Sequence, residues 1–147
     1  MEVLIDNQQS NHPIAIRTVR RKAKAILSAL GSLSDELSLV FVDDNRMADL
    51  NLTYLNRQGP TNVIAFPMRE GDLGNLNPHL LGDVVISMDT CAREAQEAEL
   101  SLEERLDQLM VHGILHLFGY DHVLTESEAR IMEAKSQELL TMLQCES

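Results

Sequence analysis

The chain has 147 residues, of which 44% are apolar and 24% are charged, so its size and composition are those of one globular domain rather than of a disordered chain. Aromatic residues make up only 3% and tryptophan is absent, which argues against a module that stacks bases on an aromatic sheet face. The net charge of −11 argues against indiscriminate binding of polyanions. Residues 1–75 carry 8 basic and 9 acidic side chains, whereas residues 76–147 carry 4 and 14, so an anionic ligand is expected at the first half.

Signals for membrane insertion and secretion are not seen in the sequence. No run approaches about 18 consecutive apolar residues, and residues 1–10 have neither a basic nor a hydrophobic segment of a secretory leader. Cys91 and Cys145 form no C-x-x-C pair and are expected to be free thiols. We therefore expect a cytoplasmic protein that does not act at a membrane.

Segments with strand and helix periodicity alternate along the chain. The predicted strands are residues 2–5, 37–42, 62–66 and 83–87. The first predicted helix runs from Pro13 to Gly31, and the second is a short helix that begins after the Asp43-Asp44 cap and is broken by the segment NRQGPT (56–61) with its Gly59-Pro60 turn. The remaining predicted helices run from Ser87 or Asp89 to about Leu100, onward from a Ser101/Glu104 capping box, and from about Thr125 to Leu143. The last strand is apolar on both faces, which predicts a central place in the sheet.

This alternation predicts the fold class, an α/β (α+β) domain with a small mixed sheet of about four strands packed with about five helices. No repeat or linker interrupts the pattern, so residues 1–147 are expected to form a single domain. The polar segment 68–80 contains Gly and Pro and is long enough to suggest a lid over the sheet.

Basic side chains share one face of the first predicted helix. They are Arg17, Arg20, Arg21 and Lys24. A solvated helix surface is one interpretation of this stripe. The other is a phosphate-facing surface that binds RNA in an otherwise acidic protein.

Three of the five histidines fall in one window, HGILHLFGYDH, at residues 112–122. His112 and His116 are four residues apart and therefore lie on one face of a helix. Apolar neighbours surround both positions, so this end of the helix must be buried. Buried imidazoles need polar partners, because an unpaired polar group costs roughly 1–3 kcal/mol, and a metal ion supplies a partner to both.

A third histidine follows a predicted helix end. Gly119 can adopt a left-handed conformation, and the resulting turn can bring His122 back toward the other two. Three imidazoles with a vacant fourth position are typical of a catalytic zinc site, and zinc is favoured over nickel or copper. Asp121 is a candidate to orient one of the histidines, with a helix-end turn residue as the equal alternative.

The three histidine offsets also match the metzincin pattern H-E-x-x-H-x-x-G-x-x-H, with one difference. The glutamate that serves those peptidases as general base is replaced by Gly113. Without that carboxylate a metallopeptidase is not the first hypothesis. A glycine at this position also allows a close approach of the backbone, here expected at the metal.

The histidine window resembles the signature H-G-x-L-H-L-x-G-Y-D-H of the YbeY family of zinc-dependent endoribonucleases. The resemblance extends over nearly the whole chain through LNLTY (50–54), PTNVIAFP (60–67), LGDVVIS (81–87) and the closing helix. It implies a mixed α/β fold with the histidine helix against the sheet, and one Zn²⁺ per chain. It also implies single-strand-directed RNA cleavage in 16S rRNA 3′-end maturation and ribosome quality control. The implied partners are single-stranded or ribosomal RNA and the small ribosomal subunit or its proteins.

The sequence departs from the family pattern at two places. The family usually has an arginine, thought to face the substrate phosphate, directly after the aromatic residue of LNxxY; this chain has Leu55 there and Arg57 two residues later. The family has a strand with the pattern TDVLSF. At the corresponding positions this chain has Asn62 in place of the aspartate and Ala65 in place of the serine. Arg57 is the candidate to reach the phosphate from a remodelled loop, and an exposed turn residue is the alternative.

The predicted chemistry has two routes. Zinc on three histidines can lower the pKa of a bound water to about 7, or it can polarise a phosphoryl oxygen while the RNA 2′-OH attacks.

Two other functions compete with an endoribonuclease: a non-catalytic zinc-containing ribosome-assembly factor, and a metallopeptidase-like zinc hydrolase. The open fourth position argues against the first and Gly113 against the second.

Overall fold

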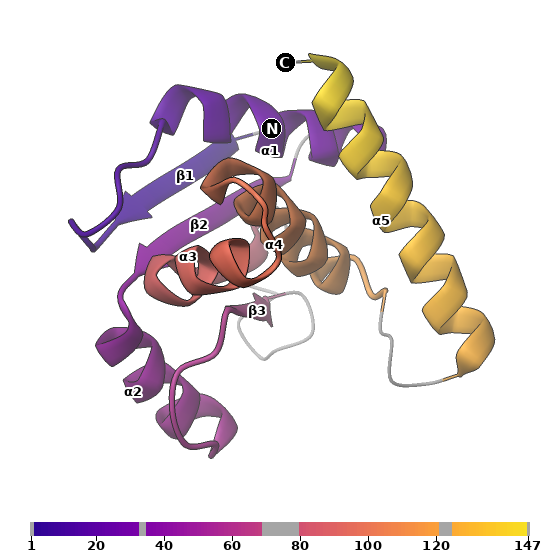
Figure 1. The fold of residues 1–147 in the computed structure, drawn as a ribbon. Helices are drawn as coiled ribbons and strands as arrows, with labels where there is room; N and C mark the ends of the chain where they lie inside the picture. Colours follow the sequence, from indigo (N-terminus) through magenta and orange to yellow (C-terminus); the bar gives the residue numbers. More distant parts are fainter. Residues whose placement is uncertain (1, 33–34, 69–79, 121–124, 147) are drawn as a thin grey trace.

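The structure is a computed structural model that describes residues 2–32, 35–68, 80–120 and 125–146. The order of strands and helices is the one that the sequence predicts (Figure 1). Their order is β1 (Glu2–Asn7), α1 (Ile16–Ala29), β2 (Glu36–Val42), α2 (Asp44–Leu55), β3 (Val63–Pro67), β4 (Leu80–Ser87), α3 (Met88–Glu97), α4 (Leu102–Leu117) and α5 (Glu126–Glu146). The fold class is therefore confirmed.

The four strands form one mixed sheet in the order β1-β2-β4-β3. β1, β2 and β4 are parallel, and β3 pairs antiparallel with β4 at the edge. The predicted central place of the last strand is confirmed, because β4 lies between β2 and β3. β4 begins at Leu80, before the predicted start at residue 83, since its glycine is part of the strand rather than a break. A Cβ at Gly82 would overlap the carbonyl oxygen of Phe66 on β3, so only glycine allows this close pairing.

Helices cover the sheet unequally (Figure 1). α1 and α4 pack on one face, with α3 and α5 against α4, and their core includes fully buried Phe41, Leu39 and Ile114. α2 packs on the other face, where Met47 is buried with Val85 and neighbours. The heavily covered face therefore holds the main core, and the histidines belong to the helix at its centre.

Local signals in the sequence fix the helix ends. Ser101 and Glu104 form the predicted capping box at the start of α4, and Asp43 accepts a hydrogen bond from the Arg46 N–H at the start of α2. Ser87, rather than Asp89, is the N-cap of α3. α1 begins at Ile16, three residues after the proline that was expected to open it.

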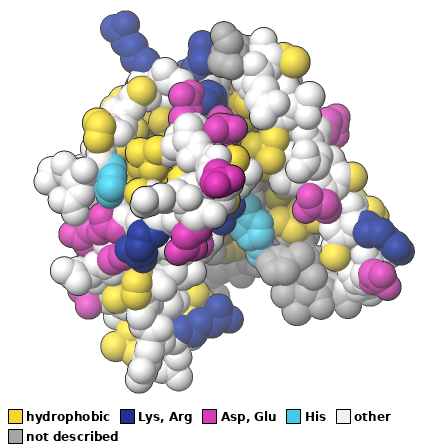
Figure 2. Space-filling model, viewed as in Figure 1, with side chains coloured by type: hydrophobic (Ala, Val, Ile, Leu, Met, Phe, Trp, Pro, Cys, Tyr) yellow, Lys and Arg dark blue, Asp and Glu magenta, His cyan; other side chains and the backbone are white. Residues whose placement is uncertain are grey.

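Acidic side chains are spread over the middle of the face shown in Figure 2, above α3 and α4.

Within the described ranges, no helix combines the length and the hydropathy that crossing a bilayer requires. The suggested lid lies outside the described residues, apart from Met68 and Leu80 at its ends.

Candidate functional site

A pair of histidines on α4 is the centre of the candidate site. α4 is buried over most of its circumference toward its C-terminal end, as the sequence predicts. His112 and His116 lie one turn apart, are both half-buried, and place their ring centroids 4.8 Å apart with an edge-on angle of 62°. The two imidazoles therefore meet at one place on the helix surface.

Both rings line a pocket of about 170 Å³ at the edge of the sheet. α4 supplies the histidines and Gly113, β3 supplies Val63 to Ala65, and the last residue of α2, Leu55, closes the rim. The walls apart from the histidines are apolar. The pocket thus gives the imidazoles a partly desolvated environment, which strengthens their interactions with a charged ligand.

Gly113 sets the distance between α4 and the sheet. A Cβ at this position would lie 2.6 Å from Cγ1 of Val84 on β4 and 3.2 Å from Cγ2 of Val63 on β3. The close approach predicted for this glycine is therefore an approach of helix to sheet. A glutamate here, as in the metzincin pattern, would point into the strands.

A second, larger cleft of about 370 Å³ lies on the other side of His112, between α4 and α5. Most of its lining is polar. The lining residues are Asn62, Val63, Arg105, Gln108, Leu109, His112, Glu133, Ser136, Gln137 and Leu140. His112 thus connects the two hollows.

The histidine geometry can be compared with that of a tetrahedral zinc site. Two imidazole nitrogens about 2.0–2.1 Å from zinc at the tetrahedral angle place their ring centres about 5 Å apart. The observed centroid distance of 4.8 Å fits that arrangement.

Gly119 has φ +88°, the left-handed conformation predicted for the turn, but Asp121 and His122 lie outside the described residues. Within the described part of the chain, no group of three His, Cys, Asp or Glu side chains could hold a metal ion.

The loop after α2 carries Arg57 and is held by the buried side chain of Asn51. Asn51 Nδ2 donates to the Gly59 carbonyl at 2.8 Å, and the Arg57 N–H donates to the Asn51 carbonyl at 3.2 Å. Asn56 ends α2 in a left-handed conformation with φ 53°. Arg57 is exposed, and Leu55 rather than Arg57 belongs to the described lining of the pocket.

The asparagine that replaces the family's acid has a specific partner. Asn62 Nδ2 donates to both carboxylate oxygens of Glu94, at 3.1 and 3.3 Å, and Glu94 also binds Arg105. An aspartate here would place a second carboxylate against Glu94, so the amide suits this chain. Sequence reasoning missed Glu94, Arg105 and Gln108, and no short-range signal connects them with Asn62.

The basic stripe of α1 lies away from the histidines. Arg17, Arg21 and Lys24 are exposed, whereas Arg20 is half-buried and its Nε donates to the Val3 carbonyl at 3.2 Å. α1 meets α4 through the N-terminal half of α4, and none of the four side chains lines either hollow beside His112. A role of the stripe in binding RNA stays a prediction.

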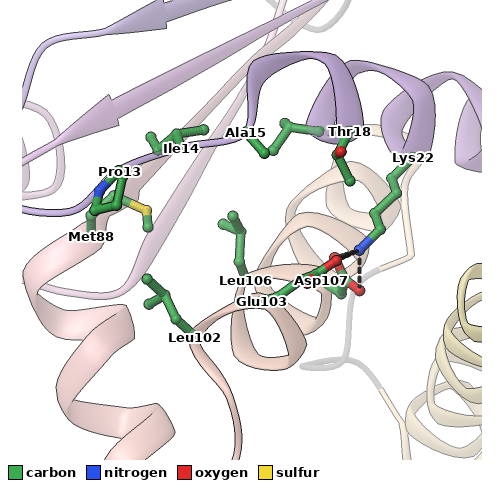
Figure 3. Close-up of a pocket in the computed structure, with 11 residues that line it drawn as sticks. Pro13, Ile14, Ala15, Thr18, Lys22, Met88, Leu102, Glu103, Leu106 and Asp107 are labelled. Atoms are coloured by element: carbon green, nitrogen blue, oxygen red, sulfur yellow. Dashed lines mark hydrogen bonds and ion pairs between the residues drawn. The ribbon is translucent and has the colours of Figure 1, made fainter. Parts of the chain in front are cut away.

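A buried lysine on α1 was missed by the sequence reasoning. Lys22 crosses to α4, where Nζ donates to Glu103 at 2.7 Å and to both oxygens of Asp107 at 3.0 and 3.1 Å, beside a cleft of about 280 Å³ (Figure 3). Burial opposes the charge of Lys22, but the two carboxylates overcome it and raise its pKa. Burial raises the pKa of Asp107, and the nearby carboxylates of Glu103 and Glu104 raise it further, although the Lys22 ammonium acts in the opposite direction. Lys22 shares the helical spacing of Val19 and Ile26, which could have identified it as buried.

Asp44 ties the start of α2 to the start of α3. It accepts hydrogen bonds from Ser87 Oγ at 2.7 Å, Thr90 Oγ1 at 2.6 Å and Arg93 Nη1 at 2.6 Å. Partial burial works in the opposite direction, but these donors lower the pKa of Asp44 below its ordinary value. Nearby, His12 Nε2 lies 3.1 Å from Oδ1 of Asp89 on α3.

Fold and site together define a class of protein: a mixed α/β domain whose buried central helix presents a histidine pair to a pocket at the sheet edge. The family described as endoribonuclease YbeY matches residues 4–144, and the chain belongs to this family.

Two relatives align with the chain over almost its whole length. Proteins named endoribonuclease YbeY from Geobacter sulfurreducens and Geobacter metallireducens are each 50% identical to it, over 98% and 99% of this chain and 97% and 98% of theirs. The solution structure of TM1509 from Thermotoga maritima aligns with a TM-score of 0.68 over 98% of this chain and 90% of that one. At 20% identity the latter similarity supports the fold.

Proposed function

We propose that this protein is a zinc-dependent endoribonuclease that cleaves single-stranded RNA. The observation that carries the proposal is the half-buried pair His112 and His116, whose 4.8 Å separation fits two ligands of one tetrahedral ion. Membership of the endoribonuclease YbeY family supports RNA as the substrate class. His122 is the proposed third ligand and Asp121 the residue that orients a histidine, so one Zn²⁺ is held per chain.

The proposed biological substrate is the 3′ region of 16S rRNA, cleaved during maturation and ribosome quality control. The proposed partners are ribosomal RNA and the small ribosomal subunit or its proteins, in the cytoplasm. The family match over residues 4–144 supports this placement. The same match supports a single catalytic domain.

The zinc would polarise a phosphoryl oxygen or lower the pKa of a bound water to about 7. The chain's own residues would position the RNA. The apolar rim around Leu55 and Val63 would exclude water from the reacting phosphate. Arg57, exposed on the loop that Asn51 holds, would bind the phosphate and stabilise the charge that develops on it.

The test combines metal content with RNA cleavage by the pure protein. Cleavage of a single-stranded RNA should be lost with a chelator and restored by zinc. His116→Ala should remove most of the zinc and the activity, since two imidazoles make a poor site. The matched control is His12→Ala, a histidine that pairs with an aspartate on α3 and lines neither hollow. Full zinc occupancy in His116→Ala would refute the metal site, and chelator-resistant cleavage would refute the zinc dependence.

The stripe on α1 is the proposed surface for flanking RNA. Neutralising Arg17, Arg21 and Lys24 together should weaken RNA association and flatten its dependence on salt, because each lost phosphate contact removes about 0.7 from the logarithmic salt slope on a single strand. Cleavage of a very short RNA should not change, because α1 does not line the pocket. An unchanged slope would show that the stripe is only a solvated helix face.

A further inference from the structure

The polar cleft between α4 and α5 has two side-chain amides whose orientation is fixed by hydrogen bonds to neighbouring side chains. Asn62 Nδ2 is bound to Glu94, and Gln108 Oε1 accepts from Arg105 Nη1 at 2.6 Å. Glu94 is not among the described residues that line the cleft, so the bonded edge of the Asn62 amide faces away from it. The groups left for a ligand are therefore an acceptor, Asn62 Oδ1, and a donor, Gln108 Nε2.

The charges in the cleft suit a neutral ligand. The guanidinium of Arg105 binds Glu94 through Nη2 at 3.0 Å and Nε at 3.2 Å, so its charge is matched inside the protein. The opposite wall carries Glu133 from α5. A phosphate would meet one neutralised cation and an additional carboxylate, whereas a neutral heterocycle would meet only hydrogen-bonding groups.

The cleft also has surfaces for the faces of a flat ring. Val63, Leu109 and Leu140 supply apolar lining from three different elements. The volume of about 370 Å³ lies within the usual range for small-molecule pockets, about 300–1,000 Å³. His112 belongs to the lining, so a ring bound here lies next to the candidate catalytic pocket.

We propose that this cleft binds an adenine base of the RNA substrate, adjacent to the cleaved linkage, through Asn62 Oδ1 and Gln108 Nε2. The inference rests on the proposed endoribonuclease function. The Watson–Crick edge of adenine has one donor, N6–H, and one acceptor, N1, which one fixed acceptor and one fixed donor satisfy completely. Guanine, cytosine and uracil each carry a third group on that edge, which must find a partner elsewhere or remain unsatisfied.

The sharpest variant is Gln108→Glu. A glutamate has the shape of the glutamine and can still accept from Arg105, but it offers the cleft an acceptor in place of the donor. Two acceptors match the N1–H and N2–H donors of guanine. The preference beside the cleavage site should therefore change from adenine to guanine, in each case by about tenfold or more. Asn62→Ala should reduce the preference for adenine without creating another.

The cleavage assay uses short single-stranded RNAs that differ in one base beside the cleaved linkage. Gln96→Glu, at an exposed position of α3, makes the same charge change outside the cleft and should keep the parent preference. Equal cleavage of all four RNAs by the parent, or an unchanged preference in Gln108→Glu, would overturn the proposal.

A binding measurement separates this proposal from the proposed function. Adenosine should shift the side-chain amide resonances of Asn62 and Gln108 in the parent, and guanosine should shift the side-chain amide resonance of Asn62 in Gln108→Glu. Binding of adenosine without RNA cleavage would support the cleft and refute the endoribonuclease function. RNA cleavage without a response to adenosine would refute the cleft alone.

Discussion

Replacing Gly113 by alanine tests how α4 is seated on the sheet, because two effects of opposite sign compete. Alanine is a better helix former than glycine, and in a free helix position the change should stabilise by about 1 kcal/mol. At this position the added Cβ would lie 2.6 Å from Val84 Cγ1. Carbon atoms in good contact are about 3.5–4.0 Å apart, so the helix or the valine must move by about 1 Å.

The valine cannot move at little cost. It is fully buried on the central strand β4, and β-branched side chains have few allowed rotamers. Overpacking of a closely packed core costs about 1–3 kcal/mol. After subtraction of the helix-propensity gain, Gly113→Ala should lower the free energy of unfolding by up to about 2 kcal/mol. It should also displace His112, the preceding residue, and weaken metal binding.

Urea unfolding of four proteins provides the measurement: the parent, Gly113→Ala, Val84→Ala and the double variant. Val84→Ala alone should cost about 1.6 kcal/mol for two buried methyl groups. It also removes both Val84 methyl groups that a Cβ at position 113 would meet, including the nearest atom, and leaves only Val63 Cγ2 at 3.2 Å. The double variant should therefore be more stable than additivity predicts, by about 0.5–3 kcal/mol. Ser28→Ala on the exposed side of α1 is the control for helix propensity alone. Additive effects of the two substitutions in the double variant, or a Gly113→Ala protein more stable than the parent, would refute the close-packing argument.

Three other predictions follow from buried or networked groups. A thiol reagent near neutral pH should modify exposed Cys145 quickly and leave Cys91 unmodified until the protein unfolds, because burial raises the pKa of Cys91 to about 11. Rapid addition of two reagent groups to the folded protein, measured by mass spectrometry, would contradict this. Asp44→Asn should lower the free energy of unfolding by about 1.5–3 kcal/mol at neutral pH, and the difference from the parent should disappear in acid-unfolding curves as the pH falls below 3.8, since the hydrogen bonds that lower the pKa of Asp44 stabilise only its ionised form. Lys22→Met should lower the free energy of unfolding in urea by about 3–5 kcal/mol, and the double variant Lys22→Met/Asp107→Leu should regain most of that stability. Equal losses of stability in the single and the double variant would refute the pairing.

The order and type of the elements could be predicted because local signals agree with the tertiary structure. The capping box at Ser101 and Glu104 fixes the start of α4, and apolar alternation identifies the strands. The start of β4 was misplaced, since the sequence does not show that Gly82 lies against the Phe66 carbonyl of another strand. Such errors concern contacts between elements, which no window of the sequence contains.

In the candidate site, too, contacts within one helix could be predicted and contacts between elements could not. His112 and His116 share one helix face, so their meeting follows from helix geometry alone. Lys22, by contrast, has its partners on α4, more than eighty positions away in the sequence. A charged residue at a core-facing position signals a buried pair, but only the fold shows which carboxylates receive it.

Arg57 is the residue proposed to bind the phosphate of the RNA. Leu55 lines the histidine pocket but is 42% exposed, whereas Arg57 is exposed on the loop held by Asn51. If Arg57 reaches the phosphate, Arg57→Ala should leave folding and zinc content intact and slow RNA cleavage about a hundredfold or more, as does removal of one oxyanion donor. Arg57→Lys should also be slow, because lysine lacks the planar fork. Leu55→Arg added to Arg57→Ala should restore part of the rate, since it places a guanidinium at the pocket itself. Cleavage at the parent rate by both Arg57 variants would show that Arg57 has no part in the reaction.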